Sequence, residues 1–380
     1  MGRPLRIVMT GGHTSVYTKE VFQIDPNTGV VDYFHSDLSH RRHQHVGGSY
    51  GESLLVAGGD DSIGANLPFP ADLFTNASRS FVAPDDFQRH HKKLRPAAAV
   101  IGKEFYMCGG YNNRLPDTEN GHLGAKKCHA YEFPSSAGDA GAWRDLADME
   151  EAVWLAAGVS LGRHLYVVGG CEIRDERVDR CLPRETTRRL DVDTGEWSTL
   201  PGVPNAANKK FALMTAAVRN GNDAKETIVA CVAKLADQKG PYECYEYDPV
   251  EETWSSFAGI DEPLRPAGVH VLNCQGRLFA VSAESADYAL FEYDNAAGGW
   301  KRVALRPHPK RQELDCAYKN SCVPPVGAVP VCYEPLVELE PLPEPQNPVV
   351  LLIGGRDGGR LAGLKSIYEY DPISRQLYEL

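Results

Sequence analysis

One hydrophobic run recurs along the whole chain, and this recurrence constrains the fold more than any other feature. It is clearest from His164 to Pro201, where short runs of β-branched and aromatic residues end at Gly-Gly, at Asp-Thr-Gly and at Pro. Runs of this kind, cut off by turn residues, are typical of consecutive β-strands. The repetition predicts that each copy forms one small sheet that buries its faces against the neighbouring copies.

Seven copies of the run are present, and five of them end in a double glycine. They are IVMTGG from Ile7, LLVAGG from Leu54, EFYMCGG from Glu104, LYVVGG from Leu165, TIVACVA from Thr227, LFAVSA from Leu278 and VVLLIGG from Val349. Most copies are followed by a second run with an acidic turn, such as YEYDP from Tyr245, and four units then carry a tryptophan, at Trp143, Trp197, Trp254 and Trp300. A small apolar run, such as PAAAVIG from Pro96, lies between units.

This ordered set of marks resembles the kelch repeat, and the resemblance covers essentially the whole chain. It implies an all-β fold, a β-propeller of four-stranded antiparallel blades around a channel, with the small apolar run innermost. The tryptophans would cover the joints between blades while their N–H groups find a carbonyl. Glycines with positive φ are expected at the tight end of the blades, at Gly11, Gly12, Gly58, Gly59, Gly109, Gly110, Gly169, Gly170, Gly354 and Gly355.

We expect one propeller over residues 1–380 with seven blades, or with six if one unit is split across the closure of the ring. Only six inner runs accompany the seven copies, because just MGRPLR precedes the first Gly-Gly strand. The missing inner strand should therefore lie beyond Leu380, unless one blade keeps an unpaired edge.

Residues 306–348 form a proline-rich, acidic insertion between the sixth and seventh units. We expect an extended surface excursion, with the sixth inner strand near Asp315 to Val323. The insertion is either a docking arm for a partner or a tolerated loop, since surface loops accept length at little cost.

The composition limits the classes of partner that the protein is expected to bind. A net charge of −11 and a pI near 5.6 argue against nucleic acid and anionic membrane surfaces. No run approaches the roughly 18 apolar residues of a membrane helix, and the N-terminus enters a strand directly, so we expect neither membrane insertion nor a signal peptide. The expected location is cytoplasmic.

The ten cysteines leave that location open. They fall into local pairs, Cys108 with Cys128, Cys171 with Cys181, Cys231 with Cys244 and Cys316 with Cys322. Disulfides between them would mean an oxidising, extracellular setting. Buried free cysteines that pack as small hydrophobes are the alternative.

Neither a metal site nor a cofactor is expected. His43 and His45 would share one side of an inner strand, but no third ligand stands at a suitable spacing. The copper oxidases among kelch propellers need a Tyr-His dipeptide, which this sequence lacks. The glycine-rich stretch from Gly354 to Gly359 ends a repeat strand and opens no helix, so a turn is a better interpretation than a phosphate cradle.

The kelch resemblance places a partner-binding face on the loops that follow the Gly-Gly strands and enter the inner strands. There, arginines at equivalent places around a ring would offer donors to an acidic motif. The predicted face contains His13, Arg42, His43, Asp60, Asp61, Arg95, Tyr111, Asn112, Asn113, Arg114, Arg174, Asp175, Arg177, Arg265, Arg356 and Asp357.

Two functions stay open at this point. The favoured one is a non-enzymatic module, a scaffold or adaptor that binds a partner protein or peptide on this face. The other is a propeller enzyme or carbohydrate-binding protein with its site at the channel mouth. No catalytic residue is identified for either.

Overall fold

The computed structural model describes residues 5–10, 21–34, 36–60, 71–75, 81–82, 93–111, 126–135, 141–173, 181–206, 213–221, 225–233, 240–264, 269–282, 289–307, 329–333, 350–353, 367–371 and 376–379. The chain divides into two compact units, Met1–Val337 and Glu338–Leu380. The second contains a three-stranded antiparallel sheet of β28 (Val350–Ile353), β29 (Ile367–Asp371) and β30 (Gln376–Glu379).

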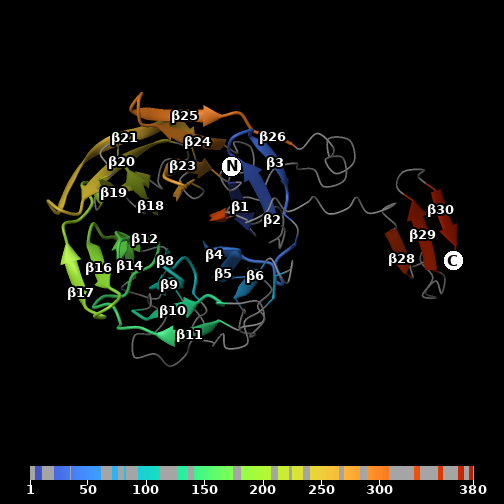
Figure 1. Ribbon diagram of the computed structural model, residues 1–380, viewed down its shortest axis with the longest axis horizontal. Coiled ribbons are helices and arrows are strands. Elements are labelled where there is room, and N and C mark those ends of the chain that lie inside the picture. Colours follow the sequence, from blue (N-terminus) through green and yellow to red (C-terminus); the bar gives the residue numbers. More distant parts are fainter. Residues whose placement is uncertain are drawn as a thin grey trace. The chain divides into compact units, whose positions relative to one another are not determined.

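The first unit is a β-propeller, and Figure 1 shows its sheets as blades arranged in a ring. The first blade contains β1 (Arg6–Thr10), β2 (Val21–Asp25), β3 (Val30–Tyr33), β26 (Arg306–Pro307) and β27 (Val329–Tyr333). The second contains β4 (His43–Tyr50), β5 (Ser53–Asp60), β6 (Asp72–Thr75) and β7 (Phe81–Val82). The third contains β8 (Ala97–Ile101), β9 (Glu104–Cys108), β10 (Cys128–Glu132) and β11 (Ala142–Asp145).

The remaining blades repeat the pattern. The fourth contains β12 (Ala157–Leu161), β13 (His164–Val168), β16 (Thr187–Asp191) and β17 (Trp197–Leu200), and a small hairpin of β14 (Cys171–Ile173) and β15 (Cys181–Pro183) follows its Gly-Gly strand. The fifth contains β18 (Leu213–Asn220), β19 (Glu226–Ala233), β20 (Gly240–Asp248) and β21 (Thr253–Leu264). The sixth contains β22 (Val269–Cys274), β23 (Arg277–Ser282), β24 (Ala289–Asp294) and β25 (Gly299–Val303).

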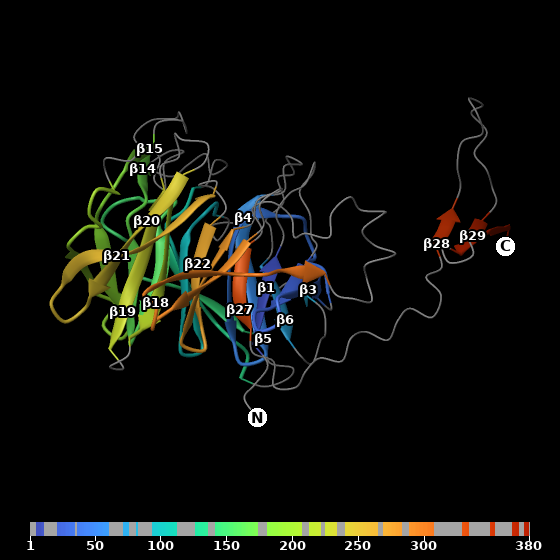
Figure 2. The ribbon, with the colours of Figure 1, turned by 90° about the horizontal axis from the view of Figure 1, so that it is seen from above.

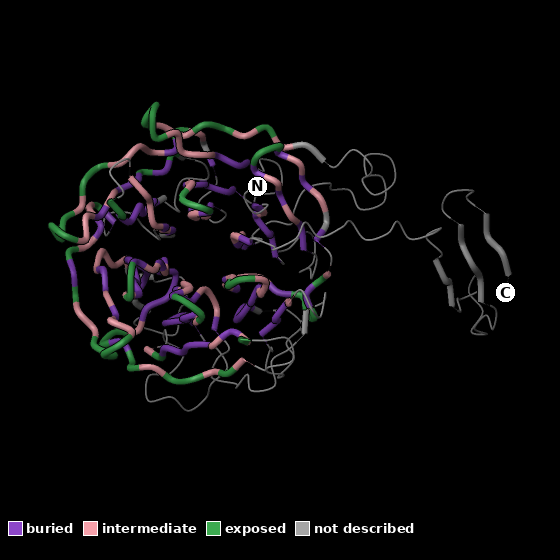
Figure 3. The backbone as a smooth tube through the Cα atoms, viewed as in Figure 1, coloured by how far each residue is buried: buried purple, intermediate pink, exposed green. Residues whose placement is uncertain are grey.

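The small apolar runs are innermost, as the sequence predicted. The ring of inner strands is β4, β8, β12, β18, β22 and β27, each in contact with the next, and β27 contacts β4. The inner strands β8 and β12 combine buried and half-buried residues, whereas Gly-Gly strands such as β9 and β13 are buried almost throughout. Figure 3 shows that the exposed residues gather at the outer rim. Burial on both faces explains why the Gly-Gly strands are continuous apolar runs rather than alternating ones.

The ring has six blades, so the prediction of seven is wrong. The first blade takes its inner strand from β27, whose residues Val329 to Tyr333 pair antiparallel with Thr10 to Arg6 of β1. Figure 2 shows β27, in orange, beside β1, in blue. The inner strand predicted beyond Leu380 is thus supplied from within the chain, and the stretch predicted near Asp315 to Val323 lies outside the described residues.

Two pieces of the predicted insertion belong to the first blade. Besides β27, the short strand β26 pairs in parallel with β3, with Arg306 opposite Val30. The described parts of residues 306–348, β26 and β27, therefore belong to the ring and are not a surface excursion.

Acidic turns join the two outer strands of several blades. In the sixth blade, Asp294 Oδ1 accepts hydrogen bonds from the backbone N–H groups of Ala296 (2.8 Å) and Ala297 (3.0 Å). Asp191 and Asp248 make the same turn in the fourth and fifth blades. A carboxylate that satisfies two turn donors stabilises the local conformation, which is the physical reason for the Tyr-Asp-Pro-like mark.

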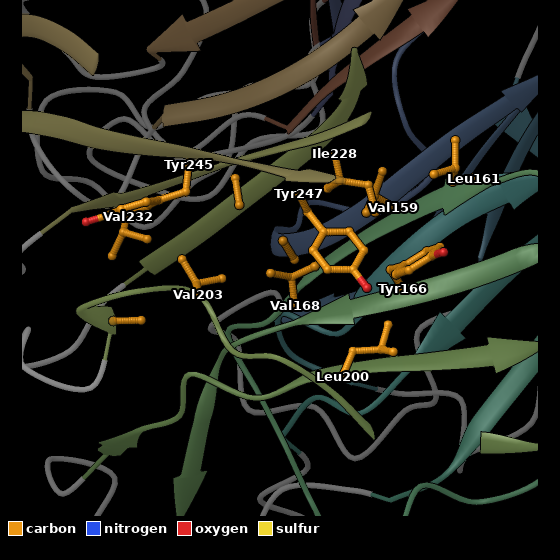
Figure 4. Close-up of a cluster of buried hydrophobic side chains, with 13 residues drawn as sticks. Val159, Leu161, Tyr166, Val168, Leu200, Val203, Ile228, Val232, Tyr245 and Tyr247 are labelled. Carbon is orange, nitrogen blue, oxygen red and sulfur yellow. The ribbon is translucent and has the colours of Figure 1, made fainter. Parts of the chain in front are cut away.

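Tryptophans lie at the seams between blades, as predicted. The indole Nε1 of Trp197 donates to Ala147 O (3.1 Å), that of Trp254 to Pro201 O (2.9 Å) and that of Trp300 to Ala258 O (2.9 Å). Each acceptor belongs to the preceding blade or its exit loop. Figure 4 shows the apolar cluster between the fourth and fifth blades, where Tyr166, Val168 and Tyr247 meet.

The described Gly-Gly pairs adopt the left-handed backbone that the sequence predicted for Gly58, Gly59, Gly109, Gly110, Gly169 and Gly170. At Gly58, with φ of 70°, an added Cβ would lie 2.5 Å from the carbonyl oxygen of Lys93 in the next blade. Only glycine fits such a position. The pairs Gly11–Gly12 and Gly354–Gly355 lie outside the described residues.

Disulfides link strands within and between blades. Cys108 bonds Cys128 and Cys231 bonds Cys244, as the sequence suggested. Cys274 bonds Cys332, a link between the sixth blade and β27 that the sequence did not suggest. Cys171 is also disulfide-bonded, while Cys316 and Cys322 lie outside the described residues.

Candidate functional site

The inner strands surround a cavity of ≈ 1010 Å³. Small residues let these strands approach one another. A Cβ on Gly158 of β12 would lie 2.2 Å from the backbone nitrogen of Ala98 in β8, and one on Gly47 would lie 2.6 Å from Val331 of β27. The walls of the cavity are therefore packed strands, and its shape is set by the fold.

Three non-glycine residues with positive φ lie at one end of this channel, where the inner strands of the second, third and fourth blades begin. Gln44, Arg95 and Leu155 have φ of 57°, 46° and 59°, a region that non-glycine residues rarely adopt. The N–H of Arg95 donates to Gln44 O (2.8 Å), and the N–H of Leu155 donates to Arg95 O (3.3 Å). We call these three residues the channel mouth; their shared strain marks it as a place to look for function.

His45 lines the cavity and is held as a neutral imidazole. Its Nε2 lies 2.8 Å from Thr10 Oγ1, and that hydroxyl also donates to Val329 O (3.1 Å). Because the only hydroxyl proton is used, Nε2 must donate to Thr10, which leaves Nδ1 as an acceptor. Burial lowers the pKa of His45 well below its usual value, with further lowering by the charge of Arg42.

His270 and Arg95 reach the same cavity from opposite sides of the ring, from the sixth and third blades. Burial, and to a smaller extent the charge of Arg95, lowers the pKa of His270 to about 4. Burial also lowers the pKa of Arg95, although an arginine stays protonated at any physiological pH. At neutral pH the fixed positive charge of Arg95 thus lies in the same cavity as the neutral side chains of His45 and His270.

Behind the channel mouth, two cations occupy matching places at the ends of the Gly-Gly strands. Arg42 is fully buried, bonded to the Asp72 carboxylate and to Gly58 O (3.1 Å). Lys93 is 1% exposed and donates from Nζ to Lys127 O. Burial lowers the pKa of Lys93 to about 7. These side chains brace the blades, because Arg42 donates to a carbonyl and a carboxylate, and Lys93 to a carbonyl, inside the protein.

A small apolar cluster lies beside the channel mouth. Tyr111, Trp154, Leu155 and Cys171 are buried together, with Leu94 packed against them. The rings of Tyr111 and Trp154 are 5.8 Å apart. Two isolated β-bridges, Leu94 with Tyr111 and Trp154 with Cys171, extend the third and fourth blades at this end.

The described part of the predicted face is divided between surface and interior. His43 and Asp60 are cross-strand neighbours at the end of the second blade, and Arg95 lines the cavity together with His43. Arg42 and Tyr111 are buried, so their side chains offer no exposed surface. The other predicted residues lie outside the described part of the chain, namely His13, Asp61, Asn112, Asn113, Arg114, Arg174, Asp175, Arg177, Arg265, Arg356 and Asp357.

Sequence reasoning did not single out His270 or Lys93. A signal existed for His270, because VHVLN alternates apolar and polar residues in a run that was assigned to an inner strand. No such signal existed for Lys93, since its amine bonds the carbonyl oxygen of Lys127, a residue distant from it in sequence.

Within the ranges that the structure describes, no three His, Cys, Asp or Glu side chains gather in a way that could hold a metal ion. In the same ranges, no helix has the length and apolar character needed to cross a bilayer.

Comparisons with known proteins point to one repeat type. The chain is 27% identical over 204 residues to the F-box/kelch-repeat protein At2g29830 of Arabidopsis thaliana, a match that covers 50% of this chain and 44% of the relative. It is 33% identical over 173 residues to the human kelch repeat and BTB domain-containing protein 13, covering 44% of this chain and 34% of the relative. No protein-family profile matches the chain. The matches thus span less than half the length of either relative. Together with the ring of four-stranded blades and its seam tryptophans, they identify the chain as a kelch-repeat β-propeller.

Proposed function

We propose that this protein is an interaction module that binds a partner protein or peptide on the face where the Gly-Gly strands end and the inner strands begin. The observation that carries the proposal is the kelch-repeat propeller itself, shared with two relatives whose names describe kelch repeats joined to an F-box or a BTB domain. A rigid ring presents loops from many blades at one end, and such loops are where binding residues concentrate on a scaffold.

The described residues at that end suit recognition. The channel mouth is fixed by hydrogen bonds between blades. The apolar cluster of Tyr111 and Trp154 packs beside it, and the β14–β15 hairpin extends the fourth blade. Residues that are already fixed lose little entropy on binding. The predicted arginines would then select an acidic partner segment.

Charge reversal on the proposed face tests this function. We expect Arg174→Glu, Arg177→Glu and Arg265→Glu combined to abolish capture of partners that co-purify with the wild-type protein. The matched control is Lys103→Glu with Arg163→Glu, two exposed residues on hairpins at the opposite end of the third and fourth blades. Loss of the same partners from both variants, or from neither, would overturn the assignment of the face.

A further inference from the structure

Arg95 is a lone guanidinium inside the channel of an acidic protein. The chain has a net charge of −11, yet no carboxylate pairs with Arg95 in the contacts that the structure describes. Glu226 also lines the cavity, but it is paired with Asn220 at the far end of β18, whereas Arg95 stands before the first residue of β8. The carboxylate and the guanidinium therefore belong to opposite ends of the channel.

The surroundings of Arg95 offer neutral hydrogen-bonding groups. The Nδ1 atom of His45 is buried and has no hydrogen-bond partner among the described residues, and the Nε2–H bond to Thr10 makes it an acceptor. His270 and Gln44 also line the cavity. A buried acceptor without a partner is costly, so a ligand hydroxyl that donates to Nδ1 removes that cost.

From these contacts we propose that the channel below the mouth binds a small hydroxylated monocarboxylate, with its carboxylate on Arg95 and its hydroxyl groups on His45, His270 and Gln44. A planar guanidinium matches a carboxylate with two parallel N–H···O bonds. The cavity of ≈ 1010 Å³ is large enough for a ligand of metabolite size.

The charge of the site decides between carboxylate and phosphate. Arg95 is the one arginine or lysine of the described cavity lining, and burial lowers the pKa of His45 and of His270 below neutral pH. One positive charge balances a monocarboxylate but leaves a phosphate dianion with an uncompensated charge in a confined space, which is unfavourable. A neutral sugar would leave the guanidinium unpaired.

Thermal shift and calorimetry with defined probes test the site. Sodium D-glucuronate and sodium D-gluconate are compared with D-glucose and inorganic phosphate at constant ionic strength. We expect at least one of the two sugar acids to raise the Tm of the wild-type protein with increasing concentration, and glucose and phosphate to leave it unchanged. Arg95→Gln should weaken binding of that acid by about ten- to a hundredfold.

The matched control is Arg163→Gln, which removes an exposed arginine at the opposite end of the blades and should bind as the wild type does. If Arg95→Gln does not fold, Arg95→Lys keeps the charge without the planar fork and should still weaken binding. A wild-type protein that responds to neither sugar acid, that responds to phosphate instead, or that binds equally well after the Arg95 changes would overturn the proposal. The site does not depend on the proposed partner face, whose test leaves Arg95 intact.

Discussion

Cys274 at the end of β22 is disulfide-bonded to Cys332 of β27, at a sequence separation of 58 residues. The bond joins the last complete blade to the strand that completes the first one. Contacts of β27 with β1 and β4 continue the ring on its other side. The closure of this propeller thus depends on one short strand that is fixed covalently to one neighbour and by a β-ladder to another.

Removal of this bond should lower the stability of the ring more than removal of a bond within one blade. A disulfide restricts the unfolded chain more when its loop is longer, so Cys274→Ser with Cys332→Ser should lower the free energy of unfolding by about 4 kcal/mol. Cys231→Ser with Cys244→Ser, whose separation is 13 residues, should cost about 3 kcal/mol. Denaturant unfolding under non-reducing conditions measures both, and an unchanged midpoint in the first variant would contradict the structural role.

The seam tryptophans should contribute through both their ring and their N–H group. Trp254→Phe keeps an aromatic ring against Tyr247 but leaves Pro201 O without its donor, so we expect a loss of about 1 kcal/mol. Trp254→Ala also empties the seam and should cost about 3 kcal/mol. Val250→Ala, at a residue that is 76% exposed in the same blade, is the control and should change nothing measurable. Equal losses in the Phe and Ala variants would show that ring packing contributes little.

Most of the fold could be predicted because the kelch marks are local. A Gly-Gly pair, an acidic turn and a seam tryptophan each reflect a contact made within a blade or with its immediate neighbour. Gly58 shows this, since its positive φ recurs at Gly109 and Gly169. Its close approach to a carbonyl oxygen of the next blade also recurs at Gly109, where an added Cβ would lie 2.4 Å from Val153 O. Such features repeat in sequence because their physical causes repeat in space.

The blade number could not be predicted, because closure of the ring is not local. The strand that closes it, Val329 to Tyr333, contains Pro330 and lies in a proline-rich stretch. A proline argues against a strand unless that strand lies at an edge, where some N–H groups are unpaired. Strand β27 is such an edge, bonded to β1 on one side only, and nothing local to the run reveals its partner more than 300 residues earlier.

The channel was only partly predictable for the same reason. Arg95 stood out because its Leu-Arg-Pro-Ala context recurs at Arg265, which is a local signal. The effect of its charge is seen only in the folded ring, where Arg95 lowers the pKa of His270 in the sixth blade. The burial of Arg42 likewise comes from Asp72, on a strand that begins 30 residues later.

The buried pair of Arg42 and Asp72 should be sensitive to loss of either partner. Arg42→Met leaves the Asp72 carboxylate buried with a backbone N–H, that of Ser39 (3.1 Å), so we expect a loss of about 3–5 kcal/mol. Adding Asp72→Asn removes the unpaired charge and should restore part of that loss. Arg302→Met breaks an exposed pair with Glu262 and should cost at most about 1 kcal/mol. A double variant no more stable than Arg42→Met would contradict a charge-based explanation.

The cysteines should be largely oxidised in the native protein. Seven of them are disulfide-bonded in the structure, and the bond of Cys171 requires an eighth. Thiol titration of the denatured, unreduced protein should therefore detect at most two free thiols among the ten cysteines. Detection of eight or more would mean that the strand-paired cysteines pack as free thiols. The oxidised result would favour the extracellular alternative over a cytoplasmic location.

Lys93 should make stability depend on pH. Its pKa falls from 10.5 to about 7 on folding because of burial, so between these values the unfolded chain binds more protons than the folded one. The free energy of unfolding should then rise with pH from about 7 upwards, by at most about 1.4 kcal/mol per pH unit. Lys93→Met removes this titration and should flatten the profile between pH 7 and 9. Lys225→Met is the control, because the Asp248 carboxylate raises the pKa of that exposed lysine and moves its titration above this window. If Lys93→Met keeps the same slope as the wild type and as Lys225→Met, Lys93 is not neutral in the folded protein and its amine is solvated.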